Sequence, residues 1–150
     1  MNGKSAYVCG PLTELPSLSR VLAKRFYERI ADACTDVLGE RAFVPHEHFD
    51  PLVHVAFAPQ QVDEAERRQV CERTNLLIVV VSFGPSWGGG IEVEMARQND
   101  VPVIILRQED KKVSRLLLGN PAVRAVLSYK DEDEAISLLR NALSITTAAV

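Results

Sequence analysis

The stretch LLIVVVSFGPSWGGGIEVEMA, residues 76–96, decides the fold. It opens on a continuous run of apolar, largely β-branched residues, which is typical of a central parallel strand covered on both faces. Three glycines follow, at positions 88–90, and a mixed apolar and charged segment comes after them. The stretch therefore predicts a buried strand, a glycine-rich loop and a helix in succession.

The same alternation extends outward along the chain. Strands are predicted at 4–9, 41–44, 76–81, 101–106 and 123–128. Helices are predicted at 17–38, 62–74, 90–99, 111–118 and 131–143. Ser17 is the expected cap of the first helix and Gly39 its stop signal. The stripe of that helix expected to face the core is Leu18, Val21, Leu22, Phe26, Ile30, Ala33 and Val37.

Strands that alternate with helices favour a parallel sheet with helices on both faces. We expect residues 1–150 to form one doubly wound α/β domain, Rossmann-like or flavodoxin-like, with five parallel strands in the order 2-1-3-4-5. In that order the first and third strands are neighbours. The loops that leave them, GPLTELP (10–16) and SFGPSWGGG (82–90), then meet where ligands bind in such folds.

Composition excludes several classes of protein. The 150 residues carry 17 Lys+Arg against 20 Asp+Glu, a net charge of −3, so a non-specific nucleic-acid binder is not expected. The 47% hydrophobic content suits a folded globular chain. The apolar run at 76–81 is too short to span a bilayer. The three cysteines are widely spaced, which indicates neither a disulfide framework nor a zinc ribbon, and a cytoplasmic protein is expected.

The glycine loop is the main candidate for a ligand site. It lacks the GK[ST] ending of a Walker A loop and does not fit GxGxxG, yet glycines before a helix leave backbone amides uncovered. Glu92 follows in the first predicted turn, and its neighbours three and four residues on are apolar. Glu92 is therefore the carboxylate aimed at the sheet, where a helix start favours its ionised form. Such a carboxylate can attack an electrophilic sugar carbon.

Two motifs resemble the nucleoside 2-deoxyribosyltransferase family, which includes the 2′-deoxynucleoside 5′-monophosphate N-glycosidases. The PS-x-G-x-G-x-E pattern of that family is matched in order and spacing by Pro85, Ser86, Gly88, Gly90 and Glu92. The opening YVCGPLT is similar to the family's first motif through Tyr7, Cys9, Gly10 and Pro11. The resemblance extends to at least residue 106.

The resemblance implies roles for these residues. Glu92 would be the nucleophile at the anomeric carbon, without a cofactor or metal. Ser86 and the amides of Gly88, Gly89 and Gly90 would bind a 5′-phosphate or the sugar hydroxyls, and Tyr7, Gly10 and Pro11 would lie in the same cleft. The family's Asp, which helps to protonate the leaving base, is matched by Glu66, with Asp63 and Glu64 as alternatives. The first loop reads Leu12-Thr13-Glu14 where phosphate-specific members carry an Arg, and Glu14 works against a phosphate.

The segment 45–60 contains all three histidines. On an extended chain His46 and His48 would share a face, which makes a metal site conceivable. No strong metal spacing follows, so we favour a histidine that contacts substrate. His46 is the first choice, because it directly follows the second predicted strand and can assist protonation of a leaving group near neutral pH.

Three functions remain open at this stage, and the third of them is a purely structural or interaction protein. One is an enzyme that cleaves or transfers the N-glycosidic bond of a nucleoside or nucleoside 5′-monophosphate, with water or a second base resolving the intermediate. A second is a non-catalytic nucleotide sensor that uses the same cleft. The resemblance also implies a homo-oligomer in which a neighbouring subunit helps to close the cleft.

Overall fold

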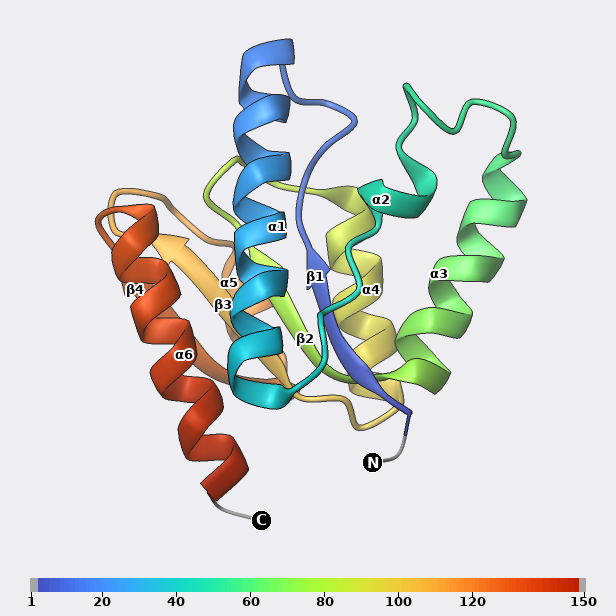
Figure 1. The fold of residues 1–150 in the computed structure, drawn as a ribbon. Helices are drawn as coiled ribbons and strands as arrows, with labels where there is room; N and C mark the ends of the chain where they lie inside the picture. Colours follow the sequence, from blue (N-terminus) through green and yellow to red (C-terminus); the bar gives the residue numbers. More distant parts are fainter. Residues whose placement is uncertain (1–2, 149–150) are drawn as a thin grey trace.

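A computed structural model describes residues 3–148 and contains one sheet of four parallel strands. The strands, in spatial order, are β1 (Ser5–Cys9), β2 (Thr74–Val80), β3 (Val103–Gln108) and β4 (Val123–Tyr129). Figure 1 shows helices on both sides of this sheet. The predicted parallel α/β architecture is confirmed, whereas the prediction of five strands in the order 2-1-3-4-5 is wrong.

The missing strand is the segment 41–44. It lies along the free edge of β1 but joins it through a single bridge between Tyr7 and Phe43. Two backbone bonds hold it there: the Val8 amide donates to the Phe43 carbonyl at 2.9 Å, and the Phe43 amide donates to the Ala6 carbonyl at 2.8 Å. Pro45 follows, and it has no amide with which to extend the ladder. A predicted strand is thereby reduced to a bridge.

Two pairs of long helices cover the faces of the sheet. Helices α1 (Ser17–Leu38) and α6 (Glu132–Ala148) pack on one face, and α3 (Pro59–Arg73) and α4 (Trp87–Gln98) pack on the other. The short helices are α2 (His46–Phe49) and α5 (Arg115–Leu118). Both α3 and α4 begin three residues earlier than the sequence predicts. Among residues 3–148, no helix combines the length and apolarity needed to cross a membrane.

Alternation along the strands divides the core into two layers. On β1, Ala6 and Val8 point toward α1 and α6, while Tyr7 and Cys9 point toward α3 and α4. The same period of two runs through β2 and β3, whose side chains are buried on both faces. Tyr7 and Cys9 are thus directed to the layer that also contains the inward face of α4.

The first turns of α1 do not face the core, although the sequence predicts that they do. Leu18, Val21 and Leu22 are 74%, 55% and 44% exposed, because these turns reach beyond the end of β1 and have no sheet beneath them (Figure 1). Farther along α1, Phe26, Ile30 and Ala33 are buried as expected. Pro16 precedes the helix, and no side chain caps it, so the predicted cap by Ser17 is wrong. Gly39 ends the helix as predicted, at a φ of 81°.

Candidate active site

Glu92 projects from α4 toward the sheet, as its helical spacing predicts, and only 7% of it is exposed. Because α4 begins at Trp87, Glu92 lies in the second turn of the helix and not in the first. The side chain of Glu94, two residues on, is 45% exposed and forms an ion pair with Arg97. The two carboxylates of this motif therefore have separate surroundings, and only Glu92 belongs to the interior.

Ser86 organises the glycine triplet. Its hydroxyl oxygen accepts from the Gly89 amide at 3.1 Å, and its carbonyl accepts from the Gly90 amide at 3.1 Å. Two of the three amides predicted to bind substrate are therefore already engaged, and Gly88 is the one not bonded to Ser86. Gly89 is also tightly packed, because a Cβ there would lie 3.1 Å from the Cys9 sulfur.

Two side chains of β1 face Glu92. The Tyr7 hydroxyl donates a hydrogen bond to Glu92 Oε1. Tyr7 is completely buried, and its ring stacks on Phe43 with the centroids 5.4 Å apart. Cys9, two residues along the strand, points the same way. Tyr7 therefore lies behind Glu92 and supports it, rather than lining the open cleft as predicted.

The protonation of Glu92 is set by opposing effects. Burial raises the pKa of Glu92 above its usual value, while hydrogen bonds from Cys9 and Tyr7 act to lower it. The expectation that the helix start simply keeps this group ionised is therefore wrong in its direction. Burial and the nearby Glu92 charge also raise the pKa of Tyr7 and of Cys9 well above their usual values, so both remain protonated donors to the carboxylate.

A cleft of about 680 Å³ opens beside Glu92. Its walls come from the first loop, the segment 45–59, α3 and the start of α4. Of the predicted site residues, Gly10, His46, Glu66, Ser86, Gly88, Gly89 and Glu92 line it. Pro11 and Gly90 do not. Pro11 is buried, and its carbonyl accepts from the Tyr27 hydroxyl at 2.6 Å.

Glu66 is a further carboxylic acid in the lining of the cleft. Burial raises its pKa to about 7, and the negative charges of Glu92 and Asp63 contribute to this rise. Of the two alternatives, Asp63 also lines the cleft but is paired with Arg67 at 3.1 Å, and Glu64 lies outside it. The structure therefore brings Glu66 and Glu92 to one cleft, and Glu66 is the one that is partly protonated near neutral pH.

His46 and His48 do not form the predicted pair, although His46 and His54 line the same cleft. Residues 46–49 form one helical turn instead of an extended segment, so His46 and His48 do not share a face. His48 stacks on Phe43 with the centroids 4.5 Å apart. His46 lines the cleft, with Nε2 3.0 Å from Glu28 Oε1 and a buried Nδ1 that has no partner within the described part of the chain. His54 also lines the cleft.

One group of side chains in residues 3–148 could hold a metal ion. It consists of Glu28, His46 and Glu47, with ligand atoms within 4.8 Å of one another. Glu47 is already bonded to Arg41 at 2.7 Å, which places a positive charge beside the group. The arrangement suits an ion-pair network better than a metal centre.

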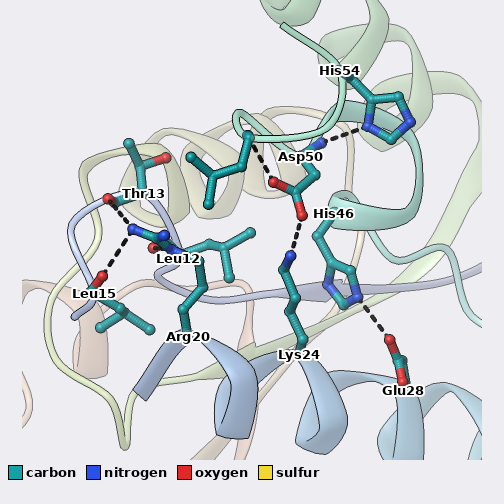
Figure 2. Close-up of polar contacts among 10 residues, drawn as sticks. Leu12, Thr13, Leu15, Arg20, Lys24, Glu28, His46, Asp50 and His54 are labelled. Atoms are coloured by element: carbon teal, nitrogen blue, oxygen red, sulfur yellow. Dashed lines mark hydrogen bonds and ion pairs between the residues drawn. The ribbon is translucent and has the colours of Figure 1, made fainter. Parts of the chain in front are cut away.

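An ion pair fixes the outer wall of the cleft to α1. Lys24 contacts the nearly buried Asp50, whose other oxygen accepts from the Leu52 amide at 2.9 Å (Figure 2). The Asp50 amide in turn donates to His54 Nδ1 at 3.0 Å. Burial alone would raise the pKa of Asp50, but these contacts more than offset it and lower the pKa. The segment that carries His46 and His54 is thus positioned by a charged anchor.

Arg20 fixes the first loop in a similar way. Its guanidinium donates to the carbonyl oxygens of Leu12, Thr13 and Leu15 at 3.4, 3.4 and 3.0 Å (Figure 2). The Arg20 guanidinium therefore binds the backbone of the loop and does not line the cleft. The one charged side chain that the first loop adds to the cleft wall is that of Glu14.

A second hollow, of about 390 Å³, lies at the carboxyl end of β2 on the other side of the glycine loop. Lys111, Lys112 and Ser114 line it from the connection between β3 and α5. Sequence reasoning did not single out these residues. The available signal was a pair of lysines in the loop that follows a buried strand, three and four residues after β3 ends.

Comparison with solved structures identifies proteins of the same fold. No protein-family model and no curated protein sequence matches the chain. Among solved structures, a CMP N-glycosidase of Clostridium botulinum, BcmB, superposes with a TM-score of 0.67 at 18% identity, over 93% of this chain and 99% of that one. BlsM matches with a TM-score of 0.62 at 17% identity, over 98% and 96% of the two chains.

A conserved protein of Enterococcus faecalis V583 also matches, with a TM-score of 0.61 at 15% identity over 93% of this chain and 98% of that one. These similarities extend over nearly the whole of each structure. The resemblance drawn from the two loop motifs is thereby confirmed for the fold. The chain has the fold of the CMP N-glycosidase BcmB and of BlsM.

Proposed function

We propose that this protein cleaves or transfers the N-glycosidic bond of a nucleoside or nucleoside 5′-monophosphate, with Glu92 as the nucleophile. The observation that carries the proposal is the buried Glu92 carboxyl at a cleft of about 680 Å³, hydrogen-bonded by Tyr7 and accompanied by Glu66. The shared fold with a CMP N-glycosidase supports the same class of bond.

The proposed displacement begins at the anomeric carbon. A Glu92 oxygen forms a bond to C1′ as the bond from C1′ to the base nitrogen breaks and its electron pair leaves with the base. Protonated Glu66 gives its proton to the base, which departs neutral. Water or a second base then gives a proton to ionised Glu66 as it attacks C1′ and displaces the Glu92 carboxylate, which restores both acids, so the same site serves a hydrolase or a transferase.

The remaining cleft residues position the substrate in this proposal. Gly10 and Gly88 allow the sugar to approach the backbone, and the hydroxyl of Ser86 lies at the same edge of the cleft. His46, oriented by Glu28, is the alternative proton donor to the base. Its place in the wall of the cleft supports a contact with the substrate.

We also propose a homo-oligomer that covers the mouth of the cleft. Large apolar side chains are exposed at the start of α4 and in the cleft wall, among them Trp87, Ile91, Val55 and Phe57. Val55, Phe57 and Ile91 line the cleft itself. Exposed apolar residues gathered near one opening are typical of an interaction surface.

Base release from a panel of nucleosides and their 5′-monophosphates tests the proposed function. Wild type should release base, Glu92→Gln should lose about a thousandfold or more in rate, and Glu94→Gln, which changes a solvent-facing acid on the same helix, should not. Intact-protein mass spectrometry should show a glycosyl adduct on wild type alone. Equal release by wild type and Glu92→Gln would refute the assignment. Saturable nucleotide binding without release would assign the sensor function instead.

A further inference from the structure

The wall segment 51–58, between α2 and α3, has almost no packing of its own. All of its residues except His54 are exposed, including Val55 at 76% and Leu52 at 63%. Apolar burial therefore contributes little to holding the segment in place. Its hydrogen bonds within residues 3–148 reach no farther than four residues along the chain. Even so, His54, Val55 and Phe57 line the 680 Å³ cleft, so this wall must be positioned from outside the segment.

Asp50 is the residue that connects the wall segment to the rest of the molecule. Its carbonyl accepts from the amides of Val53 at 3.1 Å and His54 at 2.7 Å, and its side chain accepts from the Leu52 amide. Its own amide donates to His54 Nδ1 at 3.0 Å, which orients that ring. Asp50 is only 2% exposed, and its second carboxylate oxygen contacts the Lys24 ammonium of α1 (Figure 2). Within the described chain, this pair is the one hydrogen bond or ion pair that joins residues 50–58 to a partner more than four residues away.

Lys24 belongs to a row of charges on α1. Arg20, Lys24 and Glu28 are spaced four residues apart and therefore share one face of the helix. Arg20 holds the first loop, Lys24 holds Asp50, and Glu28 Oε1 lies 3.0 Å from His46 Nε2 (Figure 2). None of the three charges lines the cleft. One face of α1 thus fixes two walls of the cleft, the first loop and the segment that follows His46.

We propose that Lys24 is a positioning residue for substrate binding, which acts through Asp50 to hold the wall segment against the nucleoside or nucleotide in the cleft. The inference rests on the proposed function and deepens it, because it separates the groups that set affinity from the groups that react. Glu92 and Glu66 lie on α4 and α3, which the ion pair does not contact. Loss of the pair should therefore weaken binding and raise KM, while kcat on bound substrate is retained.

The main test removes both charges at once. Lys24→Met alone would leave a nearly buried carboxylate without its partner, which can unfold the protein for reasons unrelated to substrate. Lys24→Met combined with Asp50→Asn removes the pair, and the amide oxygen can still accept from the Leu52 amide. If the released segment adopts the binding position about a tenth of the time, KM for base release rises about tenfold. The double variant should show this rise with kcat nearly unchanged, and Lys24→Arg, which keeps a cation, should stay close to wild type.

Arg29→Met is the matched control. Arg29 is also a paired cation of α1, but its partners are Glu132 and Asp133 of α6, and none of the three lines the cleft. This variant should change neither KM nor kcat. Limited proteolysis with chymotrypsin gives a readout that does not need activity, because the wall segment offers Leu52 and Phe57 as cutting sites. Cutting there should be faster in the double variant than in wild type, and unchanged in Arg29→Met.

The outcomes separate this inference from the proposed function. A wild-type KM in the double variant, a loss that falls on kcat instead of KM, or cutting of the wall segment at the wild-type rate would overturn the role of Lys24 while leaving the N-glycosidase in place. Absence of base release by wild type would instead refute the proposed function. Calorimetric binding of the same nucleosides and monophosphates then decides the inference, which requires weaker binding in the double variant and is overturned by equal or absent binding.

Discussion

Glu92 depends on Tyr7 for its charge. The Tyr7 hydroxyl favours the ionised carboxylate against the effect of burial, so its removal raises the pKa of Glu92 further. We expect Tyr7→Phe to move the acidic limb of the profile of kcat/KM against pH upward by about one pH unit, the worth of one charge-assisted hydrogen bond. Tyr129→Phe, which loses a buried hydroxyl contact to Ser82, should leave the limb in place. An unmoved limb in Tyr7→Phe would contradict the coupling.

Glu66 should make stability depend on pH. Its pKa is raised from 4.5 to about 7 in the folded protein, so its contribution to stability is fully present below pH 4.5 and is lost as pH rises through 7. Glu66→Gln has no charge to bury, and it should therefore be more stable than wild type at pH 8, by about 1–2 kcal/mol after allowance for solvent screening.

Thermal unfolding at pH 5 and pH 8 measures this difference. The gap in Tm between Glu66→Gln and wild type should be clear at pH 8 and small at pH 5. Glu64→Gln, on the exposed side of the same helix, should show no such dependence on pH. A gap that is constant with pH would mean that Glu66 is not buried as a charge. In the activity profile, Glu66→Gln should also lose the fall in rate above pH 7.

At the scale of elements, Gly10 in the first loop and Gly90 in α4 have different structural roles. A Cβ on Gly10 would lie 2.4 Å from the hydroxyl oxygen of the buried Tyr27, whereas a Cβ on Gly90 would meet open space within α4. Gly10→Ala should therefore destabilise the fold by about 1–3 kcal/mol through overpacking. Gly90→Ala should stabilise it by about 0.5–1 kcal/mol through helix propensity.

Chemical denaturation of the two variants beside wild type measures these changes. Opposite signs are expected for Gly10→Ala and Gly90→Ala, although each adds one methyl group to a glycine. A stabilised Gly10→Ala would show that Tyr27 can move away and that the first loop is not held by this contact. A destabilised Gly90→Ala would show that this position of α4 is not helical.

Sequence patterns predicted most helices and strands, but they did not predict the residue at which each helix begins or how much of it the sheet covers. The triplet Gly88–Gly90 indicates a loop, yet Ser86 bonds to two of its amides and starts α4 three residues early. The apolar residues at the start of α1 fit a core stripe, yet no sheet lies beneath them. Periodicity reports which side chains share a face of a helix, and it does not report how far the neighbouring layer extends.

At the scale of the whole molecule, the sequence predicted the meeting of two loops but not the charges around them. Neighbouring first and third predicted strands became β1 and β2, so Tyr7 and Glu92 do meet. The failure of 41–44 as a strand depends on one proline and changed only the edge of the sheet. The sequence could not place the lysines at 111–112 in the second hollow, because their approach to the glycine loop depends on the pairing of β3 with β2.

The fluorescence of a single tryptophan, Trp87, can test the proposed homo-oligomer. Trp87 is the only tryptophan and is 87% exposed in the isolated chain, at the start of α4 beside the cleft. If a second copy covers this region, Trp87 leaves water, and its emission should shift to shorter wavelength as protein concentration rises through the dissociation constant. Light scattering on the same dilution series should show the mass rising over the same range.

Trp87→Ser should weaken association and leave thermal stability nearly unchanged, since an exposed side chain contributes little to the fold of one chain. An oligomer with red-shifted emission at all concentrations would place the interface elsewhere, and a monomer at every concentration would refute the proposal.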